Sequence, residues 1–190
     1  AGATLNVQGT LSTTTSVSDS GALNVTGSGV VSGGGSLTVA SGGNATFSGS
    51  GSSALGAITV NSGGTLNVQS AASVSTGASS NLTINGTLNI TGGTLTAAQD
   101  VVGTPTSVTI SGGTLKIGRN LALASAGAYT TWNSGISAAP TGTVEFTTAT
   151  AGGTTQFNNL AGGSTVQFPN LTLSGSNDPN WDGTAGTTIA

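Results

Sequence analysis

A short motif recurs from Leu5 to Ile110 and consists of two apolar residues separated by one polar residue. Its copies are Leu5-Asn6-Val7, Leu23-Asn24-Val25, Ala45-Thr46-Phe47, Leu66-Asn67-Val68, Leu88-Asn89-Ile90 and Val108-Thr109-Ile110. A nearly constant interval of about 20 residues separates them, which is typical of repeat proteins in which each repeat packs only against its neighbours. The spacing therefore predicts one continuous stack of coils.

Two further apolar positions lie between successive motifs. In the repeat that begins at Leu66, these positions are Val74 and Leu82. Side chains alternate between the two faces of a strand, so three short strands per coil would bury all of these residues. We therefore predict an all-β fold, a right-handed parallel β-helix (β-solenoid) with about 20–22 residues and three short strands per coil.

The polar residue of the motif should form a row on one outer face of the solenoid. This residue is Asn or Thr in every copy, and the row comprises Asn6, Asn24, Thr46, Asn67, Asn89 and Thr109. Asn amides stacked at the spacing of strands can form hydrogen-bonded ladders. The alternative is that Asn merely tolerates an exposed position, and neither interpretation implies a ligand.

Charge is nearly absent from the chain. Only five acidic and two basic residues occur among 190, and there is no His or Cys. A chain with two bases lacks the positive surface that nucleic acids require, and no apolar run approaches the ~20 residues of a membrane span. So little charge also favours self-association. We predict neither a nucleic acid partner nor a membrane span.

The ionisable residues do not form a catalytic pattern. Asp19, Asp100 and Glu145 are far apart in the sequence, and the bases Lys116 and Arg119 are expected to lie on a solvated edge. Hydrolases and lyases need clustered carboxylates or an activated nucleophile. We therefore predict no enzymatic activity and no catalytic residue.

Gly-Gly-Thr sequences begin at Gly63, Gly92 and Gly112, and they predict turns in which glycine adopts a positive φ. One of them opens the sequence Gly-Gly-Thr-Leu-x-Val at Gly63 to Val68. Through this motif, residues 1–125 resemble bacterial secreted β-solenoid repeats, of the kind found in autotransporter passengers and filamentous-haemagglutinin-like adhesins. The resemblance concerns architecture and brings no catalytic residue with it. Together with the composition and a chain that starts at Ala1 without Met, it leads us to expect a secreted protein, extracellular or at the cell surface.

The spacing of the apolar residues changes after residue 125. Residues 1–125 should form regular coils, and residues 126–140, which lack the paired apolar pattern, should form a loop or an excursion from the stack. The sequence Thr143–Phe146 is echoed by Thr165–Phe168 one repeat period later. For 141–190 we expect wider, aromatic-rich coils, with a small β cap carrying a terminal strand as the alternative.

The two ends of the solenoid should provide the surfaces for assembly. Unpaired strand edges are usually protected by charge, proline or a covering element, and the terminal segments have no such protection. We assign the assembly edges to Leu5 and Val7 at one end and to Thr188 and Ile189 at the other. The expected function is a structural subunit of an extracellular fibre or surface layer, joined head to tail by coil stacking or strand exchange. The partner would be a second copy of the chain.

A cell-surface adhesin or glycan-binding solenoid is the alternative function. A polar outer face could bind glycans, and a row of threonines could also order water. Thr38, Thr59 and Thr83 are expected on one face in successive coils. Because Thr is common here and favours strands, the row is also expected without any ligand.

One segment near the end of the chain matches half of a calcium loop. Asp178, Asn180 and Asp182 supply oxygens at alternate positions, and Gly183 permits the sharp turn that such loops need. The position of the usual bidentate carboxylate, however, is occupied by Ile189. Calcium is therefore the only cofactor we predict, and a solvated turn is the alternative.

Overall fold

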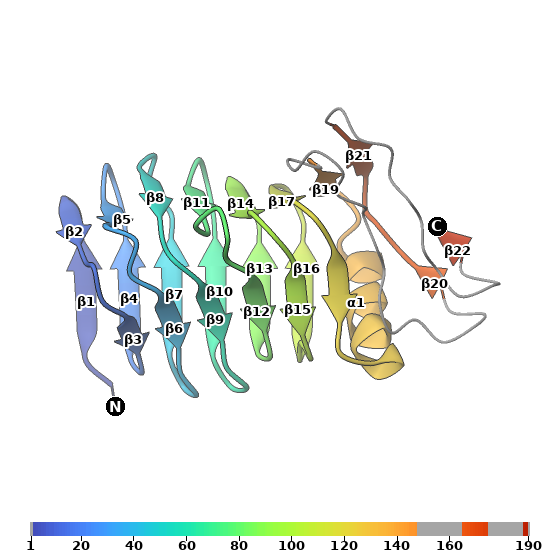
Figure 1. Cartoon of the computed structure of the whole chain (residues 1–190), viewed down its shortest axis with the longest axis horizontal. Coiled ribbons are helices and arrows are strands. Elements are labelled where there is room, and N and C mark those ends of the chain that lie inside the picture. The colour runs from blue at the N-terminus through green and yellow to red at the C-terminus, as the bar shows by residue number, and fades with distance from the viewer. Residues whose placement is uncertain (1, 148–164, 175–187, 190) are drawn as a thin grey trace.

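The computed structural model describes residues 2–147, 165–174 and 188–189, and it forms a parallel β-solenoid (Figure 1). Its first 18 strands make six coils of three strands each, and every strand pairs in parallel with strands one coil away. The predicted all-β solenoid with three strands per coil is confirmed.

Three faces run along the solenoid. The first face contains β1 (Thr4–Val7), β4 (Ala22–Val25), β7 (Asn44–Phe47), β10 (Thr65–Val68), β13 (Thr87–Ile90) and β16 (Ser107–Ile110). The second face contains β2 (Thr10–Ser12), β5 (Val30–Ser32), β8 (Ser52–Ala54), β11 (Ser73–Ser75), β14 (Thr94–Ala97), β17 (Thr114–Ile117), β19 (Thr143–Phe146) and β21 (Leu171–Leu173). The third face contains β3 (Val17–Asp19), β6 (Leu37–Val39), β9 (Ile58–Val60), β12 (Leu82–Ile84), β15 (Val101–Gly103) and β18 (Leu121–Leu123).

The core consists of columns of equivalent apolar residues. On the first face, strand pairing places in one column Leu5, Leu23, Ala45, Leu66, Leu88 and Val108. Each residue from Leu23 onward in this column is at most 2% exposed. Burying apolar surface contributes about 25 cal/mol per Å², so each coil stabilises the next one. This stacking is the main source of stability in the fold.

The turns that contain the Gly-Gly-Thr sequences need glycine for two different reasons. Gly63 and Gly93 have φ of +79° and +66°, as predicted. The prediction of a positive φ is wrong for Gly112 and Gly113. A Cβ atom on Gly113 would lie 2.6 Å from the carbonyl oxygen of Gly92, so this corner needs glycine because adjacent coils approach closely.

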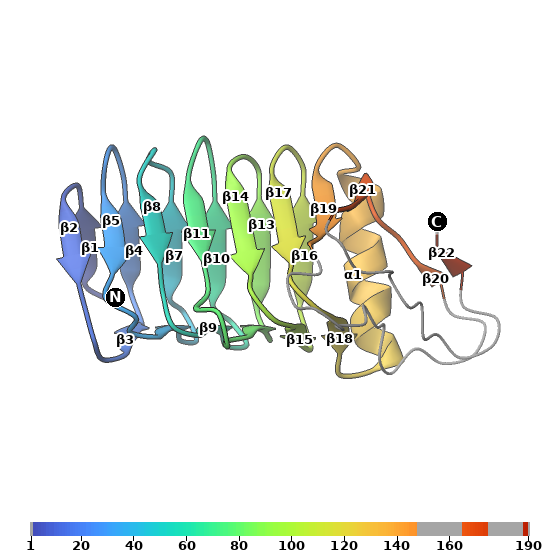
Figure 2. The ribbon, with the colours of Figure 1, turned by 45° about the horizontal axis from the view of Figure 1, so that its top comes forward.

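Residues 126–138 form a helix within the segment 126–140, for which we expect a loop or an excursion from the stack. This helix, α1 (Ala126–Ala138), is capped by Ser125, whose hydroxyl accepts a hydrogen bond from Ala128 N. It packs beside β16, where the next strand of the first face would otherwise lie (Figure 2). The spacing of Tyr129, Trp132 and Ile136 places these three side chains on one buried face of the helix.

The sequences Thr143–Phe146 and Thr165–Phe168 are similar, but the strands that contain them pair differently. β19 continues the second face beside β17, and β21 pairs with β19. In contrast, β20 (Thr165–Val166) pairs with β22 (Thr188–Ile189). The strand that pairs with β19 on its outer side is therefore β21 and not the segment 165–168.

Aromatic rings fill the end of the core beneath α1. The ring of Phe168 contacts Phe146 and Trp132 edge to face, with centroid separations of 5.9 and 6.5 Å. Trp132 Nε1 also donates a hydrogen bond to the carbonyl oxygen of Gln167, at 2.9 Å. These contacts tie 165–168 to the helix. The other two aromatic residues of 141–190, Phe157 and Trp181, lie outside the described residues.

Candidate assembly interface

The first coil forms a rim, which we call the N-terminal rim and define as β1, β2 and β3. Leu5 in β1 is 47% exposed, whereas Leu23, its partner in β4, is 2% exposed. Val7 is buried. Both Leu5 and Val7 are predicted assembly edges, and the structure places both on the inner side of the outermost strand. Of these two residues, Leu5 would therefore bury more apolar surface if a further strand covered the rim.

The outer edge of β1 presents backbone groups that no other described residue pairs. Ala3 O accepts a hydrogen bond from Ala22 N at 2.9 Å, and Val7 O accepts one from Thr26 N at 3.0 Å. Because successive residues of a strand direct their N–H and C=O groups to opposite sides, those of Thr4 and Asn6 point away from β4. This edge can bind another strand.

The asparagine row forms hydrogen bonds between coils, so the ladder hypothesis is confirmed for part of the row. Asn24 Nδ2 donates to Asn6 Oδ1 at 2.9 Å, and Asn89 Nδ2 donates to Asn67 Oδ1 at 2.9 Å. Asn67 Nδ2 donates to Asn44 Oδ1, a residue outside the predicted row, at 2.7 Å. Each of these amides therefore donates toward the N-terminal rim. Asn6, the first member, has no acceptor for its Nδ2 among the described residues.

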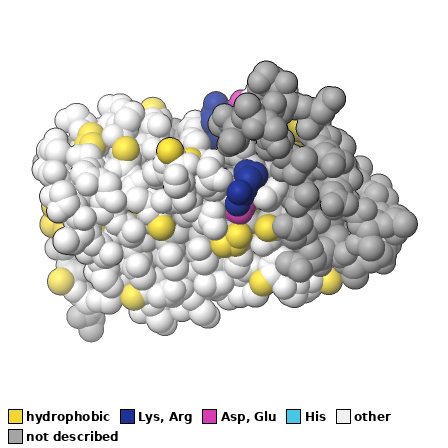
Figure 3. Space-filling view, in the orientation of Figure 1, with side chains coloured by type: hydrophobic (Ala, Val, Ile, Leu, Met, Phe, Trp, Pro, Cys, Tyr) yellow, Lys and Arg dark blue, Asp and Glu magenta, His cyan; other side chains and the backbone are white. Residues whose placement is uncertain are grey.

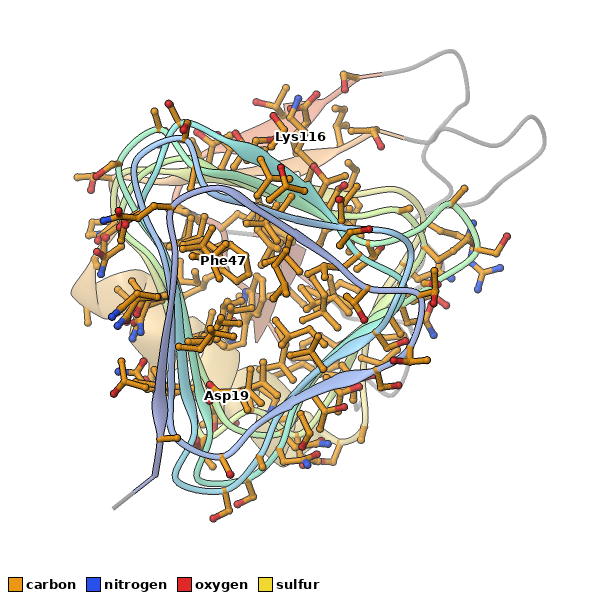
Figure 4. The ribbon with its side chains drawn as sticks, turned by 90° about the vertical axis from the view of Figure 1, so that its left-hand side faces the viewer. Asp19, Phe47 and Lys116 are labelled. Atoms are coloured by element: carbon orange, nitrogen blue, oxygen red, sulfur yellow. The ribbon has the colours of Figure 1, made fainter. Side chains whose placement is uncertain are left out.

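A hollow of about 170 Å³ lies at the rim and is lined partly by Leu5, Val17 and Asp19. Asp19 is 8% exposed and points inward, in register with Val39 of the next coil (Figure 4). Its Oδ1 accepts a hydrogen bond from Gly21 N at 3.0 Å, but its Oδ2 is buried without a partner. A buried acceptor that has no partner destabilises the fold.

The opposite end of the solenoid is covered on two faces. On the first face α1 packs over β16, and on the third face Tyr129 binds the outer edge of β18. The Tyr129 hydroxyl donates to Leu121 O at 2.7 Å and accepts from Leu123 N at 3.3 Å. Burial raises the pKa of Tyr129 to about 12. The prediction that this end lacks a cover is therefore wrong for these two faces.

The predicted C-terminal assembly edge has a partner within the chain. Thr188 and Ile189 form β22, which pairs in parallel with Thr165 and Val166 of β20. At least one side of this strand is consequently used inside the molecule. The two ends of the solenoid differ, because in the described part of the chain only the N-terminal rim exposes a complete coil.

The two basic residues are solvent-exposed, as expected, and each is also paired with an acid (Figure 3). Lys116 Nζ lies 3.0 Å from Glu145 Oε2, and hydrogen bonds from Ser174 and Lys116 lower the pKa of Glu145. Arg119 binds Asp100 through Nε and Nη2, which raises the pKa of Arg119. These pairs join adjacent coils and compensate the charges of both bases.

Among the described residues, no three His, Cys, Asp or Glu side chains gather where they could hold a metal ion. The predicted calcium ligands Asp178, Asn180 and Asp182 lie outside those residues. In the part of the chain that the structure covers, no helix has the length and hydrophobicity of a membrane span.

The threonine row is present on the third face. Thr38, Thr59 and Thr83 lie in register in three successive coils, and each is half-buried. The row is short, because Ser18 precedes it and Val102 follows it.

Comparison of the chain with models of protein families, with curated proteins and with solved structures found no match. The geometry of the N-terminal rim is therefore the main basis for a functional hypothesis.

Proposed function

We propose that this protein is a structural subunit of an extracellular fibre or surface layer, assembling through the exposed edges of its solenoid. The observation that carries the proposal is the N-terminal rim, where an unpaired strand edge adjoins the 47% exposed Leu5. Edge strands of this kind bind further strands unless charge or a covering element prevents it. A secreted location follows from the resemblance to bacterial β-solenoid repeats and belongs to the same proposal.

The surface chemistry supports a structural role over a catalytic one. Both bases are held in ion pairs, and the remaining described acid, Asp19, is buried. The outer faces carry mainly Ser, Thr and Asn, and several of these side chains form hydrogen bonds between coils. Such a rod offers rigidity and edges for assembly.

Electron microscopy of the purified protein over a range of concentrations tests the proposal. We expect filaments or sheets that grow with concentration and disappear when Leu5 is replaced by Lys, because a charged side chain at the edge blocks strand addition. Dispersed single rods at every concentration, with no difference between wild type and Leu5→Lys, would contradict a role in fibres or layers.

A cell-surface adhesin that binds glycans is the second candidate. The first face favours it, because the Asn amides and Thr hydroxyls of neighbouring coils form a regular row of hydrogen-bonding groups. A glycan array would show binding that is lost when Asn67 and Asn89 are both replaced by Ala. Binding that is unchanged in this variant would exclude the first face as the binding surface.

A further inference from the structure

We infer that Asn44 is a glycosylation site, at which the side-chain nitrogen is bonded covalently to a neutral sugar. N-glycosylation requires the pattern Asn-x-Ser/Thr, and the chain has six matches, which begin at Asn24, Asn44, Asn81, Asn85, Asn89 and Asn170. Asn and Thr are common in this chain, so the pattern alone does not single out one match. The inference goes beyond assembly and applies to a single rod as well as to a fibre.

The other five side chains take part in contacts between coils. Asn24 and Asn89 donate from Nδ2, the nitrogen that would carry the sugar, to the preceding members of the asparagine row at 2.9 Å. Asn170 donates from the same atom to a backbone carbonyl at 2.7 Å. Asn81 and Asn85 are half-buried, and their Oδ1 atoms accept backbone N–H groups of the next coil at 3.2 and 3.0 Å. A sugar on any of these five would crowd a contact between coils.

Asn44 differs from the other five in the state of its nitrogen. It is the first residue of β7 and is exposed. Its Oδ1 accepts a hydrogen bond from Asn67 Nδ2 at 2.7 Å, which turns the oxygen toward β10 and the nitrogen away from it. Asn44 Nδ2 donates no hydrogen bond to any other described residue. The atom that would be modified is therefore presented to solvent by a fixed amide group.

The neighbours of Asn44 leave room for a sugar ring. Strand pairing places it in an outward column with Thr4, Ala22, Thr65, Thr87 and Ser107. Ala22 has the smallest side chain of this column and lies on the side away from β10, to which Nδ2 turns. Thr46, the third residue of the pattern, points outward from the same face, because side chains two positions apart on a strand share a face. The amide and the hydroxyl that define the pattern are thus accessible from one side.

The reaction is a nucleophilic substitution at the anomeric carbon of a sugar that is activated by a diphosphate group. The bond from Asn44 Nδ2 to that carbon forms, the bond from the carbon to the diphosphate oxygen breaks, and the diphosphate leaves with the electron pair. One Nδ2 proton passes to a base of the transferase. Oδ1 remains available to Asn67, so the bond between the coils is preserved. Because the strands of the first face contain no charged residue, a sugar would supply the solubility that charge does not.

Transfer to the purified, folded chain tests the site. The protein is incubated with UDP-glucose and a soluble asparagine N-glycosyltransferase, and modified peptides are identified by mass spectrometry. We expect one hexose on Asn44 and roughly tenfold less on Asn24 and Asn89, whose nitrogens are already in use. Asn44→Gln should remove this label, whereas Asn24→Gln should leave it unchanged.

Thr46 provides a matched pair of variants. Thr46→Val removes the hydroxyl but keeps a side chain of similar shape, and it should abolish labelling of Asn44. Thr46→Ser keeps the pattern and should retain the label. Circular dichroism establishes that each variant is folded.

Mass spectrometry of the protein purified from the cells that produce it is the second measurement, and a sugar on Asn44 is the expected result. An unmodified Asn44 in that material would overturn the inference. So would equal labelling of Asn24, Asn44 and Asn89 in the folded chain. Neither result bears on the proposed fibre, which electron microscopy tests separately.

Discussion

At the scale of single residues, Tyr129 protects the end of the third face. Its hydroxyl binds two outward backbone groups of β18, Leu121 O and Leu123 N. Buried edge groups left without partners cost about 1–3 kcal/mol. One side chain therefore replaces two of the hydrogen bonds that a seventh strand would make.

We predict that Tyr129→Phe lowers the free energy of unfolding by about 1–3 kcal/mol at neutral pH. The variant should also respond differently to alkali. The pKa of Tyr129 is raised from 10.0 to about 12 in the fold, so its contribution is complete below pH 10 and is lost as the pH rises toward 12. Urea unfolding at pH 7 and pH 11.5 measures both effects. An identical loss of stability between these pH values in wild type and Tyr129→Phe would contradict the assignment.

A second prediction concerns Asp19, which stands in a column with Val39 and Val60. Replacing it by Val removes a buried oxygen without a partner and extends the apolar column. We expect Asp19→Val to raise the free energy of unfolding by about 1 kcal/mol. Thermal unfolding followed by circular dichroism measures the change. Ser18→Val, which alters the outward neighbour, is the control and should have a smaller effect.

The sequence predicted the inward and outward residues of the coils but not their specific partners. The alternation in Leu66-Asn67-Val68 identifies the core and the asparagine row, because it depends only on neighbouring residues. The bonds of Tyr129 and the pair of Lys116 with Glu145 depend on which strands become adjacent. Lys116 and Glu145 are separated by more than one repeat period, since α1 lies between their strands and interrupts the repeat.

At the scale of elements, α1 is a helix that the alternating pattern of the strands does not predict. Its signals are present in the sequence, with a capping Ser125 and apolar residues at Tyr129, Trp132 and Ile136. A search for alternating pairs does not detect a spacing of three and four residues. The helix covers β16 because its apolar side fits the open end of the core.

The contact between α1 and β16 can be tested at Gly135. A Cβ atom at this position would lie 1.7 Å from the carbonyl oxygen of Val108, so Gly135→Ala must displace the helix. We predict a loss of about 2–3 kcal/mol, since large destabilisation follows overpacking at a buried contact. Chemical denaturation measures it.

Gly127→Ala is the control in the same helix. A Cβ atom there would have no neighbour closer than Ser125 Oγ at 3.7 Å. Ala is favoured over Gly in a helix by up to about 1 kcal/mol, so this variant should be as stable as wild type or more stable. Equal destabilisation by both substitutions would show that α1 does not pack on β16 as described.

At the scale of the whole molecule, the solenoid is a sum of similar coils. Thr65 pairs in register with Thr87, and the chain from Thr65 to Gly86 forms one complete coil. Deleting residues 65–86 would place β13 on β7 with every apolar column preserved. In such repeats each coil contributes its own stability and one interface.

We predict that the chain without residues 65–86 folds and unfolds cooperatively at a lower temperature than wild type. Deleting residues 65–75 removes β10 and β11 but keeps β12, so every later strand would meet a strand of a different face in the coil before it. This control should not fold. Circular dichroism and size-exclusion chromatography measure both variants. Folding of the two deletions with equal stability would contradict the observed register.

The unequal cover of the two ends has a mechanical consequence. Aromatic rings, α1 and Tyr129 anchor one extremity, whereas β1 is held through a single neighbour, β4. A rod built in this way should unravel in one direction under load, coil by coil from β1. Hydrogen exchange should correspondingly be fastest in β1 and should slow progressively toward β16.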